Sequence, residues 1–140
     1  MKPEIWGKYG WCFFHLVTFG YPENPTETDK ENYYAYINSL KNVLPCDKCK
    51  QNLKKHLKKY PVTVEALSSR SALVKWGIDL HNIVNYYTGK PMMSYQMAMG
   101  ELDKIINPQA PSNGSNGMFW TYVGMLLLGL AIVYLIARSA

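Results

Sequence analysis

At 140 residues, the chain is long enough for one small domain, or for one domain with an appendage. Its formal charge of +5 is modest and comes without a nucleic-acid recognition motif, so we expect no nucleic-acid partner. Three cysteines are too few for the disulfide framework of a small secreted protein, and the first residues contain no apolar run typical of a signal peptide. These features favour a chain that is made and kept in the cytosol.

The first part of the chain predicts two helices. Apolar residues recur at intervals of three and four from about Glu4 to Phe19, which is typical of a helix. A break rich in glycine and proline follows. Thr28 and Glu31 then have the spacing of a capping box, with the threonine capping and the glutamate reaching back. We therefore expect a second helix that opens there and ends near Leu44.

A Cys-x-x-Cys pair, Cys46 and Cys49, follows Pro45 and leads into a third predicted helix that runs to Tyr60. Proline is tolerated in the first turn of a helix, so we expect Cys46 in that turn, where backbone N–H groups lack partners. A helix N-terminus or a nearby cation lowers the pKa of a cysteine thiol from about 8.5 into a range of about 3.5–7.5. The pair is therefore suited to cycling between dithiol and disulfide.

The same spacing is also half of a zinc site, and it occurs in inert pairs as well. Zinc would need two further ligands, for which the chain offers Cys12, His15, His56 and His81, without a second Cys-x-x-Cys or a His-x3-5-His. Spacing alone thus leaves redox chemistry and a membrane-anchored zinc-binding or structural adaptor open.

Two more helices are predicted in the next part of the chain. One runs from about Ser71 to Tyr87, and a weaker one from about Ser94 to Ile106. No stretch before residue 107 alternates like a strand. The expected fold class is therefore all-α, a four-helix bundle with a short fifth helix, in a domain of residues 1–106.

The last part of the chain has a different composition. Residues 107–117 are typical of a flexible linker. Residues 118–137 carry no charge, and as a helix they would span about 30 Å, the thickness of the hydrocarbon core of a bilayer. We predict a C-terminal transmembrane helix there, followed by a short tail of residues 138–140. Because this span is synthesised last, we expect insertion after translation, with the N-terminal domain facing the cytosol.

Three motifs occur in a fixed order: Trp-x3-His, Pro-Cys-x-x-Cys and His-Asn-x-Val-Asn, each about thirty residues after the one before. Their residues are Trp11, His15, Cys46, Cys49, His81, Asn82, Val84 and Asn85. Singly each motif is weak, because a tryptophan or histidine on a helix more often belongs to the core. Together, over roughly Trp6 to Leu102, they resemble the Erv/ALR family of FAD-linked sulfhydryl oxidases.

The resemblance implies a small helical bundle, usually a homodimer, that binds FAD. Such proteins oxidise protein thiols and pass the electrons to O2, which gives H2O2, and the resemblance implies no metal. It implies that Cys49 lies against the flavin as the attacking thiolate, and that Cys46 exchanges with the substrate. Trp11 and His15 would contact the flavin portion, and Lys90 the phosphates. The adenine and ribose would be held by His81, Asn82, Val84 and Asn85. Further residues at cofactor-lining positions are Gly7, Lys8, Gly10, Phe14, Phe19, Ile78 and Tyr86.

The chain departs from the family pattern in its cysteines. Many relatives carry a second, structural pair, which would fall at Ile78 and Tyr95, and longer relatives carry a distal shuttle pair. Both are absent here, so a separate dithiol protein, thioredoxin-like or another cysteine-containing protein, is expected to bring electrons to Cys46. Cys12 is expected to be a small buried apolar residue. The minimal cysteine set and the apolar tail resemble the forms of large cytoplasmic DNA viruses, which suggests a host internal membrane or the virion membrane.

The third predicted helix also carries a basic run, at Lys48, Lys50, Lys54, Lys55, Lys58 and Lys59. Such a face serves solubility, attraction to anionic lipid or docking of an acidic substrate, and the pattern leaves these open.

Overall fold

The computed structural model describes residues 1–108, which contain five helices and no strand. The helices are α1 (Pro3–Phe19), α2 (Glu27–Val43), α3 (Asp47–Lys59), α4 (Arg70–Tyr87) and α5 (Tyr95–Ile106). Met1–Ile106 forms a compact unit of its own. The predicted all-α fold is confirmed for this part of the chain.

No helix within residues 1–108 combines the length and the apolar character needed to cross a bilayer. The transmembrane helix predicted at residues 118–137 lies outside the described residues, as do the tail and most of the predicted linker.

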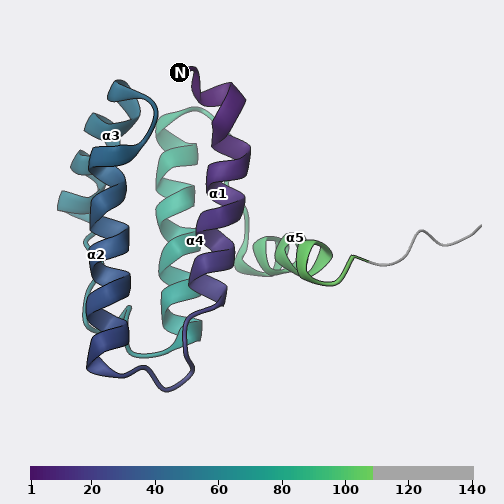
Figure 1. The fold of residues 1–140 in the computed structure, drawn as a ribbon. Helices are drawn as coiled ribbons and strands as arrows, with labels where there is room; N and C mark the ends of the chain where they lie inside the picture. The colour runs from purple at the N-terminus through teal and green to yellow at the C-terminus, as the bar shows by residue number, and fades with distance from the viewer. Residues whose placement is uncertain (109–140) are drawn as a thin grey trace, which may run out of the picture. The chain divides into compact units, whose positions relative to one another are not determined.

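Successive long helices run in opposite directions (Figure 1). The N-terminus of α1, the start of α3 and the end of α4 therefore lie toward the same end of the bundle. In the packing, α1 lies against α4 and α2 lies against α3, while α3 and α5 also contact α4. This topology brings the three motifs of the sequence, which lie far apart along the chain, to three neighbouring helices.

The cap of α2 differs from the sequence prediction. Thr26 is the N-cap, and its hydroxyl accepts a hydrogen bond from the Asp29 N–H at 3.2 Å. The Asp29 carboxylate in turn accepts from the Thr26 N–H at 2.9 Å. The capping box predicted at Thr28 and Glu31 is wrong because this earlier Thr-x-x-Asp already satisfies the same two orphan donors. The helix therefore begins at Glu27.

The core lies between the facing sides of the four long helices. Its most buried side chains are Tyr21, Ile37, Leu73, Leu80 and Thr18. α1 and α4 approach closely at Gly77, where an added Cβ would lie 3.2 Å from the Phe14 ring. A second apolar cluster of Val74, Ile78 and Ala98 joins α5 to α4.

The apolar stripe of α1 divides between core and solvent. Phe14, His15 and Thr18 are buried on the side of α1 that faces the bundle. Three large apolar side chains on the other side of α1 are exposed to solvent: Ile5 is 62% exposed, Tyr9 73% and Phe13 61%. The spacing correctly predicted the helix, but much of its apolar surface is left uncovered.

Candidate redox and cofactor site

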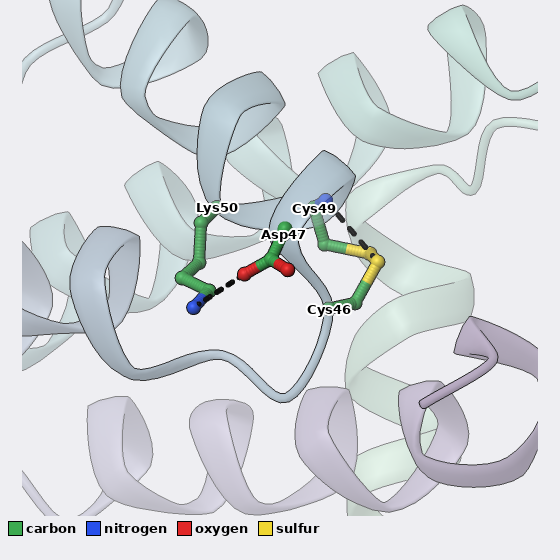
Figure 2. The surroundings of a disulfide bond; sticks show 4 residues. All are labelled: Cys46, Asp47, Cys49 and Lys50. Atoms are coloured by element: carbon green, nitrogen blue, oxygen red, sulfur yellow. Dashed lines mark hydrogen bonds and ion pairs between the residues drawn. A yellow bond between two sulfur atoms is a disulfide. The ribbon is translucent and has the colours of Figure 1, made fainter.

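Cys46 and Cys49 form a disulfide at the start of α3, with their Cα atoms 5.1 Å apart (Figure 2). Cys46 is the N-cap of the helix, one position before the first turn in which it was expected. Its sulfur accepts a hydrogen bond from the Cys49 N–H at 3.2 Å. Both cysteines are half-buried, so neither sulfur is sealed inside the protein.

The helix start stabilises negative charge on sulfur. Backbone N–H groups in the first turn of a helix lack partners within the helix, and the helix dipole adds partial positive charge there. After reduction, a thiolate on Cys46 would keep the Cys49 N–H as a donor, which lowers the pKa of a thiol. Lys50 forms an ion pair with Asp47 at 2.7 Å, on the side of the first turn away from the sulfurs (Figure 2).

The bond between the two sulfurs favours the redox interpretation over the zinc interpretation, because zinc is bound by separate thiolates. Across residues 1–108, no three His, Cys, Asp or Glu side chains are grouped so that they could hold a metal ion.

Trp11, His15 and His81 form one aromatic cluster between α1 and α4. The Trp11 and His81 rings stack, with centroids 3.9 Å apart and planes 8° from parallel. His15 Nε2 lies 2.9 Å from His81 Nδ1, so one of these nitrogens donates a hydrogen bond to the other. The structure thus brings together residues of the first and third motifs.

Both histidines are held in the neutral form. Burial lowers the pKa of His15 to about 4. Burial also lowers the pKa of His81 to about 4, helped by repulsion from His15 and Lys90. A hydrogen bond between two ring nitrogens needs one of them without a proton, which agrees with neutral rings.

Two buried nitrogens of α1 have no hydrogen-bond partner: His15 Nδ1, which belongs to this cluster, and Trp6 Nε1, which lies nearer the start of the helix. Buried polar atoms are nearly always paired, so an unpaired atom calls for an explanation. The stacked Trp11 and His81 rings give a flat aromatic surface, and His15 Nδ1 beside them can still form a hydrogen bond. Such a surface suits a planar heteroaromatic group that has nitrogen and oxygen at its edges. The residues therefore fit the planar rings of FAD.

Trp6 is not among the residues that the sequence predicts for the site. Its ring lies over Gly10, where an added Cβ would be 3.0 Å from two of the ring carbons. A glycine four residues after a tryptophan on one helix leaves room for the indole, and this spacing is the signal that could have identified Trp6. Gly7, by contrast, has open space where a Cβ would stand, and Lys8 is exposed.

The remaining predicted cofactor residues are divided between the core and the end of α4. Phe14 lies in the main core, while Ile78 and Phe19 lie in the cluster that holds α5. Val84 is half-buried, Asn85 is buried and Tyr86 is 68% exposed. The chain turns after α4 at Gly89, with φ of 69°, and the Lys90 N–H donates to the Asn85 carbonyl at 2.9 Å.

A cleft of about 410 Å³ lies along another side of α4, away from the Trp11–His81 stack. It is lined by Tyr60, Asp79, Asn82, Ile83, Tyr86, Tyr87 and Met92. Sequence patterns did not indicate its polar centre, where the Tyr60 hydroxyl donates to Asp79 at 3.2 Å. Burial and the Asp79 carboxylate raise the pKa of Tyr60 to about 12. The cleft shares only Asn82 and Tyr86 with the predicted cofactor residues.

Comparison with known proteins places these features in context. A sequence profile described as the Erv1 / Alr family matches residues 8–105. The "Probable FAD-linked sulfhydryl oxidase R368" of Acanthamoeba polyphaga mimivirus is 56% identical over 81% of this chain and 79% of that protein. The FAD-linked sulfhydryl oxidase ERV2 of Saccharomyces cerevisiae is 31% identical over 74% of this chain, which spans half of that protein.

Similarity extends to solved structures. The crystal structure of the FAD binding domain of Erv1 from Saccharomyces cerevisiae matches with a TM-score of 0.61 at 28% sequence identity. The match covers 67% of this chain and 87% of that one.

Proposed function

Because the chain belongs to the Erv1 / Alr family, we propose that it is an FAD-dependent sulfhydryl oxidase that forms disulfide bonds in protein substrates. The resemblance inferred from the three motifs is confirmed, and a viral protein is among the similar relatives. The observation that carries the proposal is the Cys46–Cys49 disulfide at the start of α3, with the Cys49 N–H directed at the Cys46 sulfur.

The exchange runs through this disulfide. A substrate thiolate attacks Cys46, the bond between Cys46 and Cys49 breaks, and Cys49 leaves as a thiolate. A second substrate thiolate then attacks the substrate sulfur of the mixed disulfide and releases Cys46. The substrate has then lost two electrons and the pair has gained them. The Cys49 N–H stabilises the departing Cys46 thiolate, which speeds this second step.

A bound FAD would supply the two-electron chemistry by which the electrons of the pair reach O2, and with two protons this gives H2O2. Trp11 and His15 would contact its flavin portion, where His15 Nδ1 would supply a hydrogen bond, and His81, stacked on Trp11, would help to hold the adenine and ribose. Lys90 would meet the phosphates. Because His15 and His81 are neutral, they add no charge to the aromatic cluster that would contact FAD.

One measurement series tests the function. The purified full chain should show flavin absorption, and it should consume O2 when a dithiol is added. Serine at Cys46 or Cys49 should abolish turnover, while serine at Cys12, a free and half-buried cysteine of α1, should leave it intact as the matched control. A colourless protein that binds stoichiometric zinc and ignores O2 would instead identify a metal-binding adaptor.

We also propose that residues 118–137 anchor the enzyme in a membrane, with the catalytic domain on the cytosolic side. The support is the uncharged, bilayer-length segment in the sequence. A host internal membrane or the virion membrane is the proposed location. The full chain should resist extraction with alkaline carbonate, and a chain that ends at residue 108 should be released.

A homodimer is the proposed assembly. Its support is the open apolar face of α1, where Ile5, Tyr9 and Phe13 recur every fourth residue. This face points away from the side of α1 that carries His15, so pairing of two copies would leave the aromatic cluster in place.

A further inference from the structure

The net charge of the protein is concentrated on one helix. Six lysines and one aspartate give α3 a formal charge of +5, which equals the formal charge of the whole chain. The rest of the chain is therefore neutral overall. A like-signed cluster of this kind creates a local potential that draws oppositely charged groups.

Most of these lysines lack an acidic partner within the part of the chain that the structure describes. Lys50 pairs with Asp47 in the same helix. The lysines of other helices that form described ion pairs are Lys30, Lys75 and Lys104, each paired with an acid three or four residues away. The α3 lysines outside any described ion pair are Lys48, Lys54, Lys55, Lys58 and Lys59, and all five are exposed.

These five lysines form a solvent-facing surface, which we call the lysine face. The opposite side of α3 is buried through Leu53, His56 and Leu57. Because α3 opens with the disulfide, the lysine face begins within one turn of Cys46 and extends about 20 Å at 1.5 Å per residue. An extended peptide of about six residues covers the same length.

We propose that the lysine face docks an acidic segment of the dithiol protein substrate and so presents its cysteines to Cys46. This inference rests on the proposed oxidase function and adds the chemical class of the substrate. The attacking thiolate is itself an anion, so the same field favours its approach to the disulfide. A lipid surface on this face would obstruct protein access to the redox pair, so a protein is the better occupant.

The test compares two short dithiol peptides with the same Cys-x-x-Cys centre, one flanked by glutamates and the other by lysines. With the purified full chain at low salt, kcat/KM should be about tenfold or more higher for the acidic peptide. This preference should shrink at high salt, because salt screens exposed charges. The small neutral dithiol dithiothreitol should show little dependence on salt.

The matched variants reverse the same amount of charge at two places. Lys54→Glu with Lys58→Glu should remove the preference for the acidic peptide and leave dithiothreitol oxidation within about twofold of the unmodified enzyme. Lys30→Glu with Lys104→Glu, on α2 and α5, should keep the preference.

Three outcomes would overturn the proposal. Equal kcat/KM for the two peptides is one, and a preference that survives reversal on α3 is another. The third is an effect of the α3 reversal that occurs only in vesicles containing phosphatidylserine, which would make the lysine face a lipid contact. Failure of the unmodified protein to oxidise dithiothreitol would defeat the oxidase function itself and is thereby distinguished from failure of the docking proposal.

Discussion

The side-chain amide of Asn82 binds the main chain of Met93 twice. Its Nδ2 donates to the Met93 carbonyl at 2.8 Å, and its Oδ1 accepts from the Met93 N–H at 2.9 Å. This pair of bonds fixes the end of the loop that carries Lys90 and leads into α5. Asn82 was predicted from the resemblance to hold adenine and ribose. In this structure, its amide positions the loop beside the cofactor residues.

We therefore predict that Asn82→Asp loosens the loop and α5. An aspartate can accept from the Met93 N–H, but its carboxylate repels the Met93 carbonyl, which leaves a polar group unpaired at a cost of about 1–3 kcal/mol. Backbone amides of residues 93–102 should exchange hydrogen faster, and FAD should dissociate faster. The change Asn52→Asp on the exposed side of α3 is the control. Unchanged exchange in residues 93–102 would contradict a positioning role for Asn82.

Helix positions were predictable because local rules decide them. Apolar spacing located α1 and α4, and the Pro-Cys-x-x-Cys pattern placed the redox pair at a helix start to within one residue. The cap of α2 was missed because Thr26 and Thr28 both begin capping patterns, and sequence alone did not say which one the chain uses.

Contacts between helices were less predictable. The spacing of Ile5, Tyr9 and Phe13 gave no sign that this side of α1 would face away from the bundle. The motifs marked Trp11 and His81 separately, but their stacking depends on how α1 crosses α4. That crossing is set by a non-local fit, in which Gly77 admits the Phe14 ring.

A prediction about packing follows from Gly77. Valine there would press its branched side chain into the Phe14 ring and Thr18, since even a Cβ would lie 3.2 Å and 3.4 Å from their nearest atoms. Gly77→Val should lower the free energy of unfolding by about 1–3 kcal/mol.

Gly100→Ala in α5 is the opposite case, because nothing lies within 4 Å of its Cβ position. It should raise stability by about 0.5–1 kcal/mol, as glycine costs a helix about that much. Urea titration measures both, and a stabilised Gly77→Val variant would disprove the close fit.

The two neutral histidines predict how the FAD-free protein responds to acid. The pKa of His15 and of His81 is about 4 in the folded protein and about 6.5 in an unfolded chain, chiefly because folding buries the rings. Between these values the unfolded chain binds more protons. Stability should therefore be fully present above about pH 6.5 and should fall as the pH drops toward 4. The slope is at most about 1.4 kcal/mol per pH unit for each histidine.

Denaturant titration at several pH values measures this slope. His15→Asn should flatten it, because one of the two acid-sensitive rings is removed. His56, whose pKa is also lowered by burial, remains in both proteins and gives the same background. An identical slope in the variant would show that His15 is not held neutral by folding.

The open face of α1 yields a prediction about assembly. Phe13 is 61% exposed and lies one turn after Tyr9, which is 73% exposed. If two copies pair through this face, Phe13→Glu places a carboxylate in an apolar contact, which costs several kcal/mol unless it finds a partner. The variant of residues 1–108 should elute as a monomer in size-exclusion chromatography with light scattering, where the unmodified fragment elutes as a dimer. Val64→Glu, at a 73% exposed residue between α3 and α4, is the control and should leave the dimer unchanged.

Equal masses for the Phe13→Glu variant and the unmodified fragment would rule out pairing through this face. Because His15 lies on the opposite side of α1, the monomeric variant should still bind FAD.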